Sequence, residues 1–200
     1  DIEGIAHKVS LTCGYLHLPD ARCAGVDLLK DASIALKRAK KDHKGHYLTF
    51  SAHLGAEARA RALMLTELRA AFEAERLYLV YQPQVDLATR ELIGLEALIR
   101  WRTEDGRFVP PDQFIPVAEH SGLMAPLGQW VMSSACMMMR QLLDAGLAPQ
   151  RMAVNVSVVQ LQDTAFADHV AQALATSGLS GQHLELEITE SVAVLPTDYL

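Results

Sequence analysis

The chain has 200 residues, of which 50% are hydrophobic and 21% charged, and its formal net charge is −6. This composition excludes an intrinsically disordered chain and is typical of a soluble globular protein with one or two buried cores. No stretch approaches the roughly 18 uninterrupted apolar residues of a membrane span, and residues 1–20 lack a basic start followed by an apolar signal segment. We therefore expect a cytoplasmic segment without membrane contact, with any membrane anchor of the parent protein lying upstream.

The charge is divided unevenly along the chain. Residues 1–53 carry eight Lys and Arg against six Asp and Glu, whereas the remainder carries ten against eighteen, and no lysine follows Lys44. So acidic a second part is a poor binder of nucleic acid polymers, which are held by cations that neutralise phosphates. An anionic ligand would need metal cations to mediate its binding. The three cysteines have no CxxC spacing, which argues against a disulfide framework or a zinc site.

The first 76 residues read as the end of one domain and a connecting helix. A β-rich run covers 9–18, apolar residues at helical spacing follow over 26–41, and a short strand pattern covers 47–50. Strand, helix and strand in this order predict the C-terminal part of an α/β domain over residues 1–53. The stretch 56–74 is rich in Ala, Glu, Arg and Leu, so we interpret 54–76 as a connecting helix.

From Leu77 the pattern alternates between strands and helices. Strands are expected at 77–83, 92–101, 152–158 and 183–191, and helices from Pro111, over 127–145 and over 164–177. Asp105-Gly106 predicts a hairpin turn, and Gly146 and Gly178 predict helix ends. This order predicts a parallel α/β sheet or barrel. Residues 77–200 are 124 residues, roughly half of a (β/α)₈ barrel, so we expect an incomplete barrel.

Three polar residues interrupt strands that are otherwise apolar: Glu96, Asn155 and Glu187. A lone buried carboxylate costs several kcal/mol unless it is paired or bound to a metal, so a shared divalent cation is one explanation. Oxygen donors without His or Cys favour Mg²⁺, Mn²⁺ or Ca²⁺ over Zn²⁺. The alternative is that Glu96 pairs with Arg100, Asn155 bonds to backbone, and Glu187 faces solvent on an edge strand. The spacing alone leaves both explanations open.

The motifs from residue 81 onward resemble the EAL domain family. EALIRW at 96–101 is similar to the family signature, and it is accompanied in the family's order by YQPQVDL (81–87), FIPVAEHSGL (114–123), GQWVMSSAC (128–136), VNVS (154–157) and ELEITES (185–191). The resemblance covers about 120 residues. It implies a modified TIM barrel over residues 77–200 that binds cyclic di-GMP and hydrolyses it to linear pGpG with Mg²⁺ or Mn²⁺.

The resemblance also implies roles for individual residues. Glu96, Asn155 and Glu187 match the first three metal ligands of the family. Arg100 matches an arginine that contacts a substrate phosphate, to which a guanidinium can offer two parallel donors. Gln82 matches a glutamine near the ligand. Glu190 matches the glutamate that steadies a later metal-bearing loop of the family. The family's paired aspartates and general-base lysine are expected beyond Leu200, so we expect the 200 residues alone to be inactive.

The N-terminal part resembles the end of a GGDEF domain, the diguanylate cyclase-like fold. VSLTCG (9–14) and ASIALKRAKKDHKGHYLTF (32–50) carry this likeness. Lys37 stands where the family usually has tyrosine, and His43, Lys44 and Gly45 stand where Gly-Arg-Asn is expected. These departures predict a degenerate GGDEF-like domain.

Three functions follow as competing hypotheses. The first is a cyclic di-GMP phosphodiesterase domain, which the intact Glu96, Asn155 and Glu187 favour. The second is a catalytically inactive receptor that binds cyclic di-GMP and signals through the connecting helix. The third is a structural module that forms dimers through an exposed barrel edge. A homodimer through the EAL-like domain is an option under the first hypothesis as well.

Overall fold

The computed structural model describes residues 9–17, 26–147 and 149–188. The chain divides into two compact units, Asp1–Leu63 and Met64–Leu200. The boundary falls inside helix α2 (Ala52–Glu73), whose start is capped by the Ser51 hydroxyl accepting the Leu54 N–H at 3.2 Å. None of the helices in the described ranges combines the length and apolar character that crossing a bilayer requires.

The first unit contains a strand–helix–strand motif. Strand β1 (Cys13–Tyr15) pairs in parallel with β2 (Tyr47–Thr49), and helix α1 (Val26–Asp42) connects them, in the order that the sequence predicts. Gly14 lets the helix approach the strand, because a Cβ atom there would lie 2.1 Å from the backbone nitrogen of Leu36. Ala35 and Ala39 are fully buried, so small residues line both sides of this contact.

The second unit is built on a five-stranded mixed sheet. Strands β3 (Leu77–Val85), β4 (Leu92–Arg102), β6 (Arg151–Val156) and β7 (Leu184–Ile188) follow one another in the order β3-β4-β6-β7, and β5 (Phe108–Val109) pairs with β4. β4, β6 and β7 are parallel, whereas β3 and β5 run antiparallel to β4. The expectation of a parallel sheet therefore holds for β4, β6 and β7 and is wrong for β3 and β5, and the described strands form an open sheet, with no closed barrel among them.

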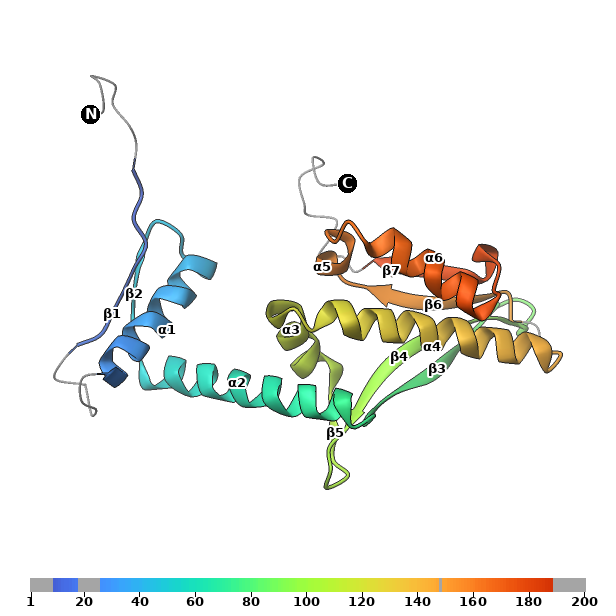
Figure 1. Ribbon diagram of the computed structural model, residues 1–200, viewed down its shortest axis with the longest axis horizontal. Coiled ribbons are helices and arrows are strands. Elements are labelled where there is room, and N and C mark those ends of the chain that lie inside the picture. The colour runs from blue at the N-terminus through green and yellow to red at the C-terminus, as the bar shows by residue number, and fades with distance from the viewer. Residues whose placement is uncertain (1–8, 18–25, 148, 189–200) are drawn as a thin grey trace, which may run out of the picture. The chain divides into compact units, whose positions relative to one another are not determined.

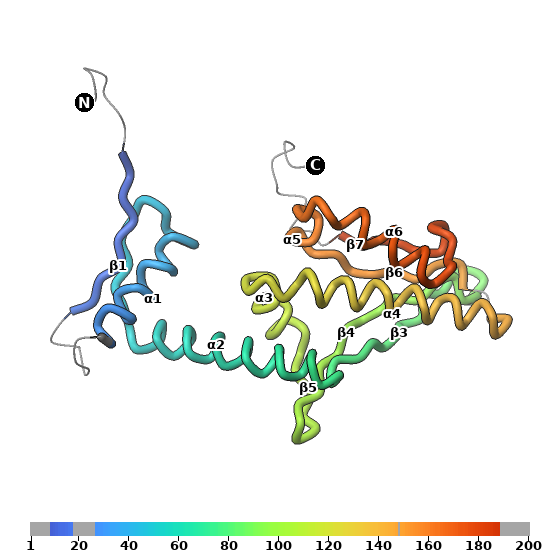
Figure 2. The backbone as a smooth tube through the Cα atoms, viewed as in Figure 1, coloured from blue at the N-terminus to red at the C-terminus, as the bar shows by residue number. Residues whose placement is uncertain are grey.

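The antiparallel pair follows from a short connection. Figure 2 shows β3 and β4 running side by side, joined by residues 86–91. A parallel pair would need a crossover of a dozen or more residues. Asp86 Oδ1 organises the turn by accepting the backbone N–H groups of Ala88 and Thr89 at 2.9 and 2.8 Å, which holds the pKa of Asp86 below its usual range.

Helices cover one face of this sheet. They are α3 (Pro111–Ser121), α4 (Met124–Asp144), α5 (Val158–Leu161) and α6 (Phe166–Ser177), with a 3₁₀ turn η2 (Gly181–His183) before β7. Figure 1 shows α4 and α6 lying side by side. Gly178 ends α6 in the left-handed region with φ 64°, as predicted. The strand expected through 158 is shorter, because Ser157 already begins α5.

Two apolar clusters hold the second unit together. One lies between the sheet and α4, and it includes Ala135, Met139, Met152 and Val154, all at most 1% exposed. The other joins the end of α2 to α3, with Trp101 and Phe114 packed edge to face at 5.6 Å between ring centroids. Phe114 is fully buried, so its ring is part of this core.

Cys136 in α4 gives a test of this packing. Its side chain is 0% exposed, and burial raises the pKa of its thiol from 9.0 to about 11. A rise of this size lowers the thiolate fraction near pH 8 by about 100-fold relative to an ordinary thiol. We expect iodoacetamide to label the exposed Cys13 within minutes and to leave Cys136 unlabelled until urea unfolds the protein, as measured by peptide mass mapping. Rapid labelling of Cys136 in the folded protein would contradict the packing of α4.

Candidate functional site

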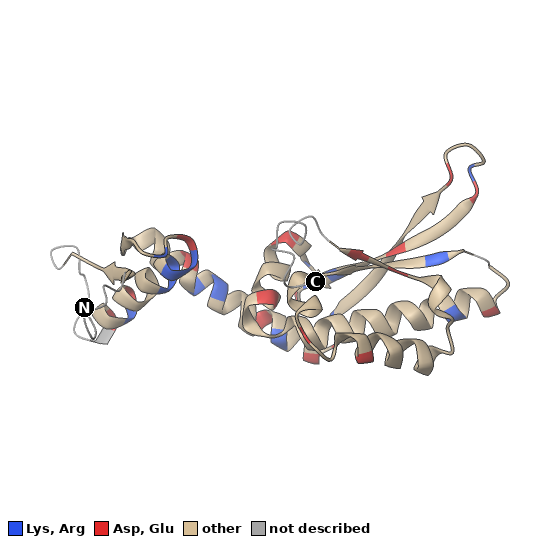
Figure 3. Ribbon diagram, turned by 90° about the horizontal axis from the view of Figure 1, so that it is seen from above, with Lys and Arg blue, Asp and Glu red and all other residues tan. Residues whose placement is uncertain are grey.

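One face of the second sheet carries polar side chains. Gln82 of β3 lies opposite Glu96 of β4, and Asn155 of β6 lies opposite Glu187 of β7. Glu96 pairs with Ala153, two residues before Asn155, and residues two apart on a strand share a face. The polar face is defined by Gln82, Gln84, Glu96, Arg100, Arg151, Asn155, Glu185 and Glu187. Figure 3 shows acidic segments on the strands of this sheet.

Glu96 and Asn155 are in direct contact. The Asn155 Nδ2 atom donates to Glu96 Oε1 at 2.7 Å, across 59 residues of sequence. Asn155 interrupts an otherwise buried stretch of β6, as expected, but its own side chain is exposed and that of Glu96 is half-buried, so neither is a fully buried polar group. The alternative ion pair with Arg100 is not among the contacts of the described residues, since the Arg100 guanidinium donates to the Ile99 carbonyl oxygen at 2.9 Å.

Glu187 lies close to the same pair. It is half-buried, and Gln84 Nε2 donates to its Oε1 atom at 3.5 Å. Burial raises the pKa of Glu187, and the charge of Glu96 raises it further, while the Gln84 hydrogen bond opposes the rise. The β4 and β7 carboxylates are therefore near enough for their charges to repel each other.

A glycine makes room for the side chains beside Glu187. A Cβ atom on Gly94 would lie 2.9 Å from Gln84 Oε1 and 3.0 Å from Arg151 Cγ. Because Gly94 has no side chain, Gln84 reaches across β4 toward Glu187, and Arg151 reaches Glu185, with Nε 2.5 Å from Oε2. Gly94 thus shapes the part of the polar face that supports Glu187.

A cleft of about 250 Å³ opens beside Asn155. Residues of β4, α3, α4, β6 and the turn after β6 line it, among them Arg100, Glu119, Asn155 and Ser157. The cleft brings the arginine expected to contact phosphate to the same place as one of the expected metal ligands. Gln82 is exposed on the polar face opposite Glu96 and is not among the residues that line the cleft.

One predicted residue lies outside the described ranges, and three residues of the site were not predicted from the sequence. Glu190 lies outside the described residues. Gln84, Glu119 and Ser157 were not predicted. Gln84 could have been found, because it stands two residues after Gln82 and so shares its face, whereas nothing local marks Glu119 or Ser157. Within the described ranges, no three His, Cys, Asp or Glu side chains gather into a metal-binding group, so the candidate site combines two carboxylates with an amide.

Comparison with known proteins identifies the family. The EAL domain family matches residues 65–198, more than half of the chain. The chain is 36% identical over 191 residues to the bifunctional diguanylate cyclase/cyclic di-GMP phosphodiesterase MucR of Pseudomonas aeruginosa, a match that covers 96% of this chain and 28% of MucR. It is 39% identical over 193 residues to the cyclic di-GMP phosphodiesterase PA2567 of the same organism, covering 96% of this chain and 33% of that protein.

The fold leads to the same family. The solved structure of the PaMucR phosphodiesterase in complex with c-di-GMP matches 68% of this chain and 55% of its own with a TM-score of 0.65 and 41% identity. The chain belongs to the EAL domain family. It spans about a third or less of the two curated relatives above.

Proposed function

We propose that the protein hydrolyses cyclic di-GMP to linear pGpG with the help of Mg²⁺ or Mn²⁺, and that Glu96, Asn155 and Glu187 are metal ligands. The observation that carries the proposal is the assembly of these three residues on one face of the sheet, next to a cleft that contains Arg100. Relatives named as cyclic di-GMP phosphodiesterases at 36% and 39% identity support it.

The donor set fits a hard divalent cation. Two carboxylates and one amide supply oxygen ligands of the kind that Mg²⁺ and Mn²⁺ prefer. Glu96 and Glu187 repel each other across the polar face, and a bound cation would remove that repulsion. When bound, such a metal supplies a nucleophilic water at neutral pH and neutralises phosphate charge.

The residues of the chain supply binding and orientation. Arg100 holds its guanidinium against the Ile99 carbonyl oxygen, and this single bond uses one of five N–H donors. The others are available to a phosphate of the ligand in the cleft. Asn155 orients Glu96 through the 2.7 Å hydrogen bond, and Gln84 contacts Glu187 in the same way from β3. Gln82 is proposed to contact the ligand, and Glu190 to steady a loop of the complete barrel.

The domain organisation is part of the proposal. Residues 1–53 are proposed to be the C-terminal part of a degenerate GGDEF-like domain, 54–76 a connecting helix, and 77–200 the N-terminal half of the EAL domain. The parallel β1-α1-β2 motif supports the first assignment.

The test is metal-dependent turnover. We would incubate the full-length protein with cyclic di-GMP and Mg²⁺ or Mn²⁺ and follow pGpG by chromatography, with a chelator as control. Conversion that the chelator abolishes and excess metal restores is the expected result. Binding of cyclic di-GMP without conversion would overturn the enzyme in favour of a receptor. Neither binding nor conversion would leave a structural module.

A further inference from the structure

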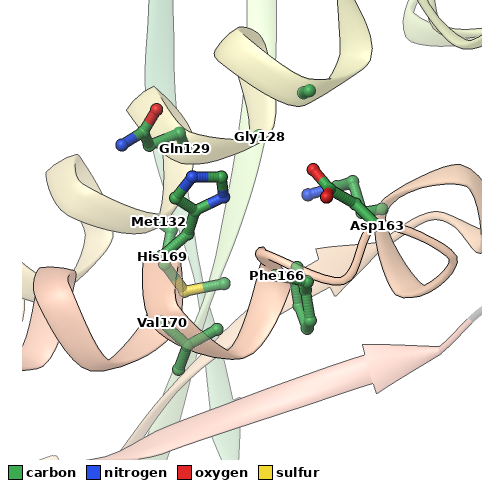
Figure 4. Close-up of a pocket in the computed structure, with 9 residues that line it drawn as sticks. Gly128, Gln129, Met132, Asp163, Phe166, His169 and Val170 are labelled. Atoms are coloured by element: carbon green, nitrogen blue, oxygen red, sulfur yellow. The ribbon is translucent and has the colours of Figure 1, made fainter.

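Helix α4 and the turn after β6 fit together at one glycine. A Cβ atom on Gly128 would lie 2.1 Å from Gln160 Nε2 and 2.7 Å from its Cδ atom. Figure 4 shows the side of α4 that carries Gly128 and Met132 facing the segment around Asp163 and Phe166. The cavity left between them is about 20 Å³, roughly the space of one water molecule. The side chain of Gln160 therefore occupies the notch that Gly128 leaves in α4.

Gln160 is fixed in this notch by a hydrogen bond. It is 6% exposed, and its Oε1 atom accepts the backbone N–H of Ser157 at 3.1 Å. In return the Gln160 backbone N–H donates to the Ser157 carbonyl oxygen at 3.1 Å. Such reciprocal bonding closes the first turn of α5. Because the amide is held at this end, a larger residue at position 128 can be accommodated only if the bond between Gln160 Oε1 and the Ser157 N–H is given up.

The closed turn begins two residues after Asn155. Strand β6 ends at Val156, which is fully buried, and Ser157 follows with 7% exposure. Asn155 itself is exposed, so packing around its side chain does not fix its direction. What fixes it is the backbone on either side, together with the bond to Glu96. Ser157 and Asn155 also line the same cleft.

We propose that Gln160, seated in the Gly128 notch, is a positioning residue that holds the β6–α5 turn so that Asn155 faces Glu96 in the metal site. The inference rests on the proposed metal-binding role of Glu96, Asn155 and Glu187. It adds a role for two residues, Gln160 and Gly128, that are not among the proposed metal ligands. Partners of metal ligands typically change metal affinity or activity by about 10- to 100-fold when they are replaced.

The experiment measures metal binding without substrate. Gln160→Met keeps the length of the side chain and removes the acceptor, and Gln162→Met is the matched control, because Gln162 is exposed two residues further on. Mn²⁺ binding to the full-length proteins is followed by electron paramagnetic resonance of the free ion, and thermal unfolding is recorded in parallel. We expect Gln160→Met to weaken Mn²⁺ binding by about tenfold or more, and Gln162→Met to leave it unchanged. Gln160→Glu, which keeps an acceptor oxygen at the same distance, should recover most of the lost affinity.

Two variants at the notch serve if Gln160→Met does not fold. Gly128→Ala should weaken Mn²⁺ binding as Gln160→Met does, because the new methyl group displaces the amide. The double variant Gly128→Ala/Gln160→Ala should bind Mn²⁺ about as weakly as Gln160→Ala alone, since the two changes break one contact. Additive losses would overturn the proposal, as would a lower melting temperature of Gln160→Met with unchanged Mn²⁺ affinity, which would make Gln160 a structural cap only.

The measurements distinguish a failure of the proposed function from a failure of the positioning role. Wild-type protein that binds Mn²⁺ but converts no cyclic di-GMP overturns the phosphodiesterase, while the comparison of Gln160→Met with Gln162→Met still decides the positioning role. Wild-type protein that binds no Mn²⁺ overturns both.

Discussion

Replacing Glu187 with glutamine is expected to lower the kcat of cyclic di-GMP hydrolysis by at least about 100-fold and, at the same time, to raise the melting temperature of the metal-free protein. The loss of activity should exceed what partners of metal ligands usually cause, because the substitution removes a proposed oxygen ligand of the metal together with its charge. Glutamine keeps the size of the side chain and can still contact Gln84 across Gly94.

The gain in stability comes from removing a repelling charge. Burial and the charge of Glu96 raise the pKa of Glu187, which means that the folded protein holds a proton there more tightly than the unfolded chain does. The metal-free protein should therefore lose stability as pH rises from the ordinary glutamate value through the raised pKa of Glu187. Glu187→Gln has no ionisable group at this position, so it should not lose stability in this way as the pH rises. The difference in melting temperature between the two proteins, measured with chelator, should be small near pH 4 and should grow toward pH 8.

Glu185→Gln is the matched control for this prediction. Glu185 stands on the same strand and face, two residues earlier, but it pairs with Arg151, and both side chains are about 40% exposed. Its replacement removes an attraction of roughly 0–1 kcal/mol and should give no gain in melting temperature. Equal behaviour of the two variants, or a lower melting temperature of Glu187→Gln at pH 8, would contradict the carboxylate repulsion.

Functional sites often contain residues whose replacement stabilises the protein and lowers its activity. Like charges that are held together in a site lower the stability of the ligand-free protein. Such charges are retained because a bound ligand of opposite charge offsets the loss. The polar face fits this description, since β4 and β7 hold carboxylates near each other on the sheet face opposite the one that packs against α4. Metal should accordingly stabilise the wild type more than it stabilises Glu187→Gln.

Local patterns predicted most of the elements of the fold. The spacing of apolar residues predicted helix α1, the α4 region and strand β4, and Gly178 predicted the end of α6 because glycine readily adopts the left-handed conformation. These signals could be read because each lies within a few residues of sequence. The antiparallel β3–β4 pair was predictable too, since residues 86–91 are too few for a crossover. The short helix α5 was not, because VNVSV reads equally well as strand until Gln160 closes on Ser157.

The candidate site was predictable in its residue types and not in its contacts. Glu96, Asn155 and Glu187 stand out as polar residues in apolar strands, and strand pairing brings them to one face. Their partners depend on register between distant segments: Gln84 and Glu187 are 103 residues apart. The space that Gly94 provides appears only when β3 and β6 are placed on either side of it. Sequence therefore indicates the donors, while topology decides which side chains orient them.

Arg100→Lys should lower kcat/KM for cyclic di-GMP by about 10- to 100-fold, which corresponds to the roughly 1.5–3 kcal/mol of a hydrogen bond to a charged group. Arginine uses one N–H for the Ile99 carbonyl oxygen and retains others that point in the fixed plane of the guanidinium. The lysine ammonium has no such plane, so it cannot keep the Ile99 contact and also offer two parallel donors to a phosphate.

Arg102→Lys provides the comparison on the same strand. Arg102 shares the face of Arg100 but is exposed at the end of β4, away from the cleft that Arg100 and Asn155 line. Its kcat/KM should stay within about twofold of the wild type, because surface substitutions of this kind seldom exceed 0.5 kcal/mol. If both variants lose the same amount, a general effect of the positive charges on an anionic ligand explains the result, and Arg100 has no specific phosphate contact. A loss confined to Arg100→Lys would place the phosphate in the cleft beside Asn155, the residue that donates a hydrogen bond to Glu96.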